Sequence, residues 1–173
     1  LLSFLPGLRG KIEDGLRAAI DTSQYCFRPD GREAFTVLFL GSFRHTPNQA
    51  ALGWFARRVL PLVLERRPEA RLVVVGAEPP PRYGLPNSSA IEVRGFVEDI
   101  REPLSRYAVF VCPILSGSGI RVKLLEAFAA GIPAVSTRLG AEGLARQDGE
   151  FCALADDPKA FAERILSLFE EPQ

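Results

Sequence analysis

Lys123 and Glu126 are the side chains whose type and spacing most directly suggest chemistry. They follow the loop Gly117–Gly119 and lie about one helical turn apart, so both leave the same face of a helix. A glycine loop before a helix offers free N–H groups and the positive end of the helix dipole to an anion. Lys123 adds a cation, and the Glu126 carboxylate can accept two hydrogen bonds from a diol such as ribose. This order predicts a site for a nucleoside diphosphate, which could carry a sugar.

Six short segments predict the strands that position this loop. They span residues 36–40, 71–75, 91–94, 108–112, 133–136 and 150–154. Helices are predicted between them, at about 48–67 and 99–107, after the glycine loop, and from 158 onward. The alternation predicts an α/β fold: a Rossmann-like, doubly wound parallel sheet of about six strands with helices on both faces.

Glycines follow the predicted strands at the edge where such sheets bind ligands. Gly41, Gly76, Gly95–Asp99 and Pro113–Gly119 all come directly after a strand. Ligands of doubly wound sheets bind beyond the carboxyl ends of the strands, where the strand order reverses. We therefore expect the nucleotide at this edge, close to the backbone.

The composition restricts the classes of partner. The chain has 173 residues, 47% of them apolar, which suffices for the core of one domain. With 21 basic and 21 acidic residues the formal net charge is zero, so we expect no nucleic-acid partner, and an anion site has to be local. No apolar run is long enough to span a bilayer.

A single histidine argues against a zinc site. The three cysteines, Cys26, Cys112 and Cys152, are expected to be free and buried thiols.

Four segments occur in an order that resembles a known family. They are Phe39-Leu-Gly-Ser-Phe-Arg44, Arg71-Leu-Val-Val-Val-Gly76, Gly95-Phe-Val-Glu-Asp99 and Gly117-Ser-Gly-Ile-Arg-Val-Lys-Leu-Leu-Glu-Ala-Phe-Ala-Ala-Gly-Ile-Pro133. Together they resemble the C-terminal, donor-binding domain of retaining glycosyltransferases of the GT-B type, the glycosyl transferases group 1 family. The resemblance implies an inter-domain connector at residues 1–33, in which 12–20 could form a short helix. It implies a nucleotide-sugar donor-binding domain at 34–173.

The resemblance also implies roles for residues around the diphosphate. Gly41 and Arg44 would lie beside it after the first strand. Lys123 and Arg44 would act as the catalytic cations, because they would stabilise the leaving diphosphate as the glycosidic bond breaks. Glu126 would hold the ribose hydroxyls.

Further residues are implied for the base, the distal phosphate and the sugar. Phe96 and Val97 would border the base. Gly117, Ser118 and Gly119 would present N–H groups to the distal phosphate and the sugar. Many relatives carry two glutamates separated by seven residues, and Ser118 stands at the first of these positions. The identity of the donor sugar is therefore left open. Ser118 as a nucleophile would need a neighbouring base, so donation from its backbone is the favoured interpretation.

The implied activity is transfer of a sugar from a nucleoside-diphosphate sugar to an acceptor. The acceptor, a glycan, lipid or small molecule, would bind an N-terminal domain that precedes this chain, so the chain alone is expected to be inactive. No Asp-x-Asp occurs, which favours a metal-independent reaction without a cofactor. The expected location is the cytoplasm, with attachment of the full-length protein to the inner membrane left open.

Other interpretations remain at this stage. An epimerase of nucleotide sugars, a phosphorylase, or a non-catalytic nucleotide-sugar-binding domain could use the same fold. A dehydrogenase is less favoured because no Gly-x-Gly-x-x-Gly follows the first strand. Lys123 and Glu126 could form an ordinary surface pair, Phe96 could be a core residue, and His45 is expected at the surface rather than as a base.

Overall fold

The computed structural model describes residues 18–27, 30–78, 85–86 and 88–170, and they form a six-stranded sheet in the order β3-β2-β1-β4-β5-β6. Every neighbouring pair of strands is parallel. The strand order reverses between β1 and β4, as the doubly wound prediction requires. The strands are β1 Glu33–Leu40, β2 Arg71–Val75, β3 Ile91–Gly95, β4 Tyr107–Cys112, β5 Ala134–Ser136 and β6 Ala153–Leu154.

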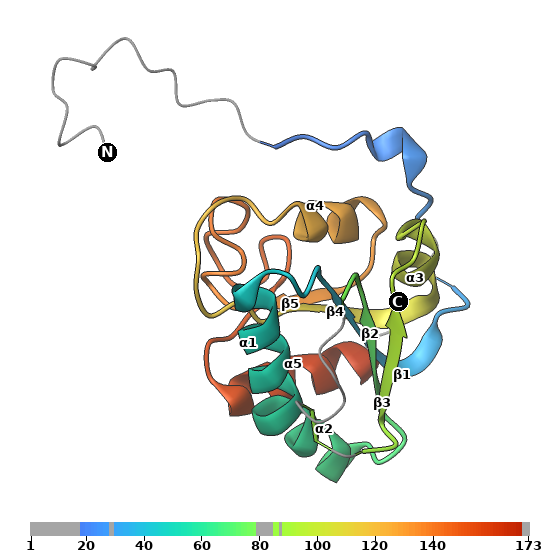
Figure 1. Cartoon of the computed structure of the whole chain (residues 1–173), viewed down its shortest axis with the longest axis vertical. Coiled ribbons are helices and arrows are strands. Elements are labelled where there is room, and N and C mark those ends of the chain that lie inside the picture. Colours follow the sequence, from blue (N-terminus) through green and yellow to red (C-terminus); the bar gives the residue numbers. More distant parts are fainter. Residues whose placement is uncertain (1–17, 28–29, 79–84, 87, 171–173) are drawn as a thin grey trace, which may run out of the picture.

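Helices cover both faces of this sheet, which confirms the predicted fold class. Figure 1 shows α4 on one side of the sheet and α1, α2 and α5 together on the other. The helical elements are η2 Thr22–Gln24, α1 Thr46–Trp54, η3 Phe55–Val59, α2 Leu60–Arg66, α3 Arg101–Arg106, α4 Val122–Ala129 and α5 Pro158–Glu170.

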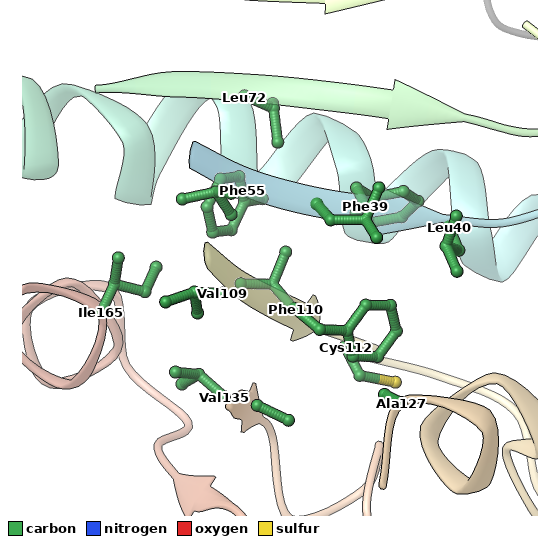
Figure 2. Close-up of a cluster of buried hydrophobic side chains, with 14 of the residues drawn as sticks. Phe39, Leu40, Phe55, Leu72, Val109, Phe110, Cys112, Ala127, Val135 and Ile165 are labelled. Carbon is green, nitrogen blue, oxygen red and sulfur yellow. The ribbon is translucent and has the colours of Figure 1, made fainter. Parts of the chain in front are cut away.

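The core lies along the central strands β1 and β4. Phe39 on β1 and Phe110 on β4 are fully buried, and Figure 2 shows them between side chains of β2, β5 and α4. On the face covered by α5, Phe161 packs edge-on against Trp54 and Phe55. Because each buried large apolar side chain contributes about 1.5–3 kcal/mol, these strands form the rigid base of the molecule.

The long helix predicted at about 48–67 is interrupted. The structure contains α1, then a π-helical turn at η3, then α2. Pro61 lies at the start of α2 and has no N–H to continue the hydrogen bonding of an α-helix. A π turn accommodates such a defect without ending the helix, so the predicted length is right and its regularity is wrong.

The sixth strand is shorter than the predicted 150–154. Only Ala153–Leu154 pair with β5. The Glu150 carboxylate instead accepts the backbone N–H groups of Arg146 and Gln147, and Gly149 donates its N–H to the Cys152 carbonyl. These local bonds make a turn where the apolar pattern had predicted a strand.

Most of the helix considered for 12–20 lies outside the described residues, and 18–20 are not helical. The described part of the predicted connector contains η2, where Asp21 accepts the N–H of Ser23. Of the three free cysteines, Cys112 and Cys152 are buried as expected, whereas Cys26 is exposed.

Candidate functional site

A cavity of about 690 Å³ opens at the carboxyl ends of β1, β2 and β4. This is the place where the strand order reverses. Gly41 and Gly76 line it, and a Cβ at Gly76 would clash with the carbonyl oxygen of Gly41. Gly76 also has a φ of +151°, which L side chains rarely adopt. Glycine therefore lets the ends of β1 and β2 approach closely enough to form the base of this cavity.

Lys123 lines the cavity and is held by two neutral acceptors. Its Nζ lies 2.9 Å from the carbonyl oxygen of Leu40 and 2.8 Å from Oδ1 of Asn48. The Asn48 amide donates in turn to the Ser42 carbonyl at 2.8 Å, which fixes its orientation. The Lys123 ammonium also lies 5.4 Å from the centre of the Phe39 ring. Since an ammonium has three N–H donors, two bonds to neutral oxygens leave its charge available to an anion.

The electrostatics of Lys123 support this interpretation. Burial lowers the pKa of the Lys123 ammonium below its usual value; the nearby Cys112 thiol raises that pKa and the Arg121 cation lowers it. The described ion pairs do not include Lys123. A desolvated cation without a carboxylate partner gains most when an anion arrives.

Glu126 also lines the cavity, one turn further along α4. Burial raises the pKa of its carboxyl, and a hydrogen bond with the Tyr25 side chain lowers it again. Lys123 and Glu126 therefore have separate partners, and the surface pair considered from the sequence is not formed between them.

The glycine loop contributes part of the cavity wall. Gly117 and Ser118 line the cavity, whereas Gly119 does not. The helix begins at Val122 rather than directly after the glycines. Gly117 and Gly119 have φ angles of +95° and +94°, conformations that favour glycine.

Arg121 is a cavity residue that the sequence interpretation missed. Its Nη1 lies 3.3 Å from the Ser118 carbonyl, while its Nε and Nη2 are buried and have no hydrogen-bond partner among the described residues. Unsatisfied buried donors are unusual in native proteins and call for a ligand or water. A second basic residue two positions before Lys123 was the available signal.

Phe96 and Val97 also line the cavity, directly after β3. Phe96 is 70% exposed, so it is not the core residue that a strand-end phenylalanine could have been. An exposed aromatic ring at a cavity is a suitable platform for a planar base.

Arg44 lies away from the cavity lining. Its guanidinium pairs with Glu78 at 2.6 Å, and both side chains are largely exposed. The adjacent His45 does line the cavity and is exposed as expected, at the N-cap of α1. The structure thus brings together Gly41, Phe96, Val97, Gly117, Ser118, Lys123 and Glu126, but neither Arg44 nor Gly119.

Within the described residues no cluster of three His, Cys, Asp or Glu side chains could hold a metal ion. The described helices also include none that is long and apolar enough to cross a membrane.

Comparison with known proteins decides the family. The family model described as "Glycosyl transferases group 1" matches residues 34–171. The chain belongs to this family. A curated relative, the "Uncharacterized 44.6 kDa protein in cps region" of Klebsiella pneumoniae, is 27% identical over 140 residues. That match covers 76% of this chain and 36% of the relative, so the chain spans about a third of its length.

Solved structures of this glycosyltransferase class share the fold. TarM of S. aureus superposes with a TM-score of 0.68 at 14% identity, covering 86% of this chain and 31% of TarM. The C-terminal domain of the group 1 family protein LpcC of Francisella tularensis gives 0.64 at 17% identity, covering 88% and 89%. HepE of Anabaena, solved in complex with UDP, gives 0.62 at 17%, covering 84% and 41%. The chain therefore shares the Rossmann-like fold of these structures, one of which is the C-terminal domain of a group 1 family glycosyl transferase.

Proposed function

We propose that this chain is the donor-binding half of a glycosyltransferase that takes a sugar from a nucleoside-diphosphate sugar. The observation that carries the proposal is the Lys123 ammonium. It lines the cavity at the strand-order reversal and is bonded to neutral oxygens alone among the described residues. The site therefore has a positive charge ready for an anion.

The diphosphate would bind between the glycine loop and α4. Gly117, Ser118, Arg121 and Lys123 all line this part of the cavity. As the glycosidic bond breaks, negative charge develops on the leaving diphosphate. Fixed donors and cations in a partly desolvated site stabilise that charge, which is the main contribution these residues would make to the rate.

The nucleoside would extend along the same cavity. Glu126 would accept hydrogen bonds from the ribose hydroxyls, and Phe96 would lie against the base. Two relatives with this fold, TarM and HepE, were solved with UDP, which makes UDP the first nucleotide to test. GDP and ADP belong in the same experiment.

Arg44 would contribute only after leaving Glu78, because the two side chains are paired at 2.6 Å. An exposed pair of this kind contributes at most about 1 kcal/mol, so a diphosphate could displace the carboxylate. We assign Lys123 and Arg121 the main part in neutralising the donor and Arg44 a secondary part.

The acceptor would bind to a separate domain. The chain spans 36% of its Klebsiella relative, so the full-length enzyme would supply the acceptor-binding half, with a glycan, lipid or small molecule as acceptor. We further propose a retaining reaction that is independent of metal ions. In this reaction the side chains of Lys123 and Arg121, rather than a metal ion, would neutralise the diphosphate.

Lys123→Gln in the full-length protein tests the proposal, with Lys159→Gln on an exposed part of α5 as the matched control. We expect Lys123→Gln to lower transfer by roughly 10²–10³-fold, the usual effect of removing one stabilising donor. Lys159→Gln should transfer as the wild type does.

Undiminished transfer in Lys123→Gln would refute the assignment of the site. Interconversion of nucleotide sugars without an acceptor would instead indicate an epimerase. Binding of nucleotide sugar by the full-length protein without any turnover would indicate a non-catalytic domain.

A further inference from the structure

Asn48 connects α1 to the Lys123 ammonium on α4. Its Oδ1 accepts from Lys123 Nζ at 2.8 Å, although the two residues are 75 positions apart in the chain. Figure 1 shows α1 and α4 on opposite sides of the sheet. The carbonyl of Leu40, the last residue of β1, accepts from the same ammonium at 2.9 Å. Lys123 is therefore held at the end of this strand by one side-chain oxygen and one main-chain oxygen.

The orientation of the Asn48 amide follows from the groups that it meets. An ammonium can only donate hydrogen bonds, and a carbonyl oxygen can only accept them. The amide oxygen must therefore face Lys123, and the NH2 group must face the Ser42 carbonyl, to which it donates at 2.8 Å. Gly41 leaves room for this amide, because a Cβ there would lie only 3.0 Å from Asn48 Cγ. A short side chain with one acceptor and one donor group satisfies both neighbours.

We propose that Asn48 is a positioning residue for Lys123, which it holds in the cavity without neutralising its charge. The inference rests on the function proposed above, in which the ammonium neutralises the diphosphate of the donor. A lysine side chain has several rotatable bonds, and ordering them on binding would reduce affinity. Asn48 and Leu40 impose that order before a ligand arrives.

The neutrality of Asn48 is what makes this arrangement suit an anionic ligand. An aspartate has nearly the same shape, and its carboxylate would be the stronger partner for an ammonium. It would, however, compensate the charge of Lys123 and repel phosphate, and it could not donate to the Ser42 carbonyl. The amide at position 48 thus fixes the lysine and leaves its charge for the diphosphate.

The test separates the phosphates of a nucleotide from its nucleoside. Binding of UDP, GDP and ADP to the full-length protein is measured beside binding of uridine, guanosine and adenosine. Asn48→Leu removes both hydrogen bonds of the amide and keeps the branched shape. It should weaken binding of the best nucleoside diphosphate roughly tenfold, the usual effect of losing a hydrogen bond to a charged group, and should leave binding of the nucleoside unchanged.

Asn48→Asp tests the importance of a neutral acceptor at this position. The variant keeps an oxygen beside Lys123, so the lysine stays in place. It should nevertheless weaken diphosphate binding at least tenfold, because the carboxylate competes with phosphate for the ammonium. Undiminished diphosphate binding by Asn48→Asp would contradict the inference.

A double variant shows whether Asn48 acts through Lys123. Lys123→Gln should weaken diphosphate binding by itself. Adding Asn48→Leu should then cause little further loss, because the group that Asn48 positions has been removed. Gln49→Leu is the matched control: this neighbouring amide also donates to a loop carbonyl, that of Phe43, but does not line the cavity. Its loss should leave both affinities unchanged.

The outcomes distinguish this inference from the proposed function. If Lys123→Gln weakens diphosphate binding and Asn48→Leu does not, the inference about Asn48 is wrong and the proposed function stands. Equal weakening of diphosphate and nucleoside by Asn48→Leu would show a merely structural role. Equal losses from Asn48→Leu with and without Lys123 would show that Asn48 does not act through the lysine. No effect of Lys123→Gln on diphosphate binding would remove both the proposed function and this inference.

Discussion

Glu126 shows at the level of one residue how burial affects a side chain of the candidate site. Burial raises the pKa of its carboxyl, so the ionised form is less favoured in the folded protein than in the unfolded chain. Its ionisation therefore lowers stability as pH rises from the unfolded pKa through the folded pKa, and the cost is fully present above that window. A group that reduces stability where it is ionised is expected at a functional site.

This argument predicts opposite effects of Glu126→Gln on binding and on stability. At neutral pH the variant should be at least as stable as the wild type in thermal unfolding. It should bind nucleoside diphosphates more weakly, by roughly tenfold for a lost charged acceptor.

The pH profile provides the check. As pH falls, the affinity of the wild type should begin to decrease at a pH above about 4.3, the usual pKa of a glutamate. The reason is that the raised pKa makes the Glu126 carboxylate take up its proton at a higher pH. Titration of the ligand's phosphate affects both proteins, so the difference between wild type and Glu126→Gln isolates Glu126. A constant difference over that range would contradict the assignment.

Arg121 gives a second prediction at this scale. Its buried Nε and Nη2 lack partners among the described residues, so Arg121→Met removes an unfavourable burial together with the proposed phosphate contact. We expect unchanged or slightly higher thermal stability with roughly tenfold weaker nucleoside diphosphate binding, and unchanged binding of the uncharged nucleoside. Arg138→Met, at an exposed ion pair with Asp156, is the matched control and should alter neither property. Equal loss of nucleoside binding in Arg121→Met would argue against a contact with phosphate.

At the level of elements, the cavity depends on how closely the ends of β1 and β2 approach. A Cβ at Gly76 would meet the backbone of Gly41, which cannot move aside as a flexible side chain could. Gly149 also has a positive φ, of +79°, but a Cβ there would meet nothing within 4 Å. Substitution of Gly76 therefore causes both a steric clash and backbone strain, whereas substitution of Gly149 causes backbone strain alone.

Gly76→Ala should lower the free energy of unfolding by about 2–4 kcal/mol, and Gly149→Ala by about 1–2 kcal/mol. Only Gly76→Ala should also weaken nucleotide binding, because it distorts the cavity. Denaturant unfolding and calorimetry measure the two effects. Equal losses in both variants would mean that the close approach of β1 and β2 is unimportant.

The elements also show what the sequence could predict. β2 has the predicted bounds Arg71–Val75, because the apolar run Leu72–Val75 is typical of a buried strand and ends at a glycine. The pattern could not reveal the turn at Glu150, which depends on a carboxylate bonding nearby backbone N–H groups. It also could not reveal the π turn, where the missing N–H of Pro61 alters the helix but does not end it.

The site was predictable to a similar extent. Lys123 and Glu126 were identifiable because they follow the glycine loop Gly117–Gly119 in one continuous segment of the sequence. Asn48 and Tyr25 were not, because they meet these side chains only after distant parts of the chain pack together. The pair between Arg44 and Glu78 depends on the positions of two different loops and was missed for the same reason.

At the level of the whole molecule, α5 supports the fold away from the cavity. Phe161 on α5 is fully buried against Trp54 and Phe55 and does not line the cavity. Phe161→Ala should therefore lower the free energy of unfolding by about 3–5 kcal/mol while the folded protein keeps its affinity for nucleotides. Phe151→Ala, at a side chain that is 61% exposed, should cost less than about 1 kcal/mol.

Thermal unfolding and calorimetry below the transition distinguish the two properties. A large loss of affinity in fully folded Phe161→Ala would show that α5 takes part in binding. The separation of α5 from the binding edge would then be wrong.

A crystal structure of the protein with UDP, GDP or ADP tests the central claim most directly. The account predicts diphosphate oxygens within about 2.7–3.2 Å of Lys123 Nζ, beside Gly117 and Ser118, with the ribose against Glu126. A nucleotide bound elsewhere while this cavity holds no ligand would contradict it.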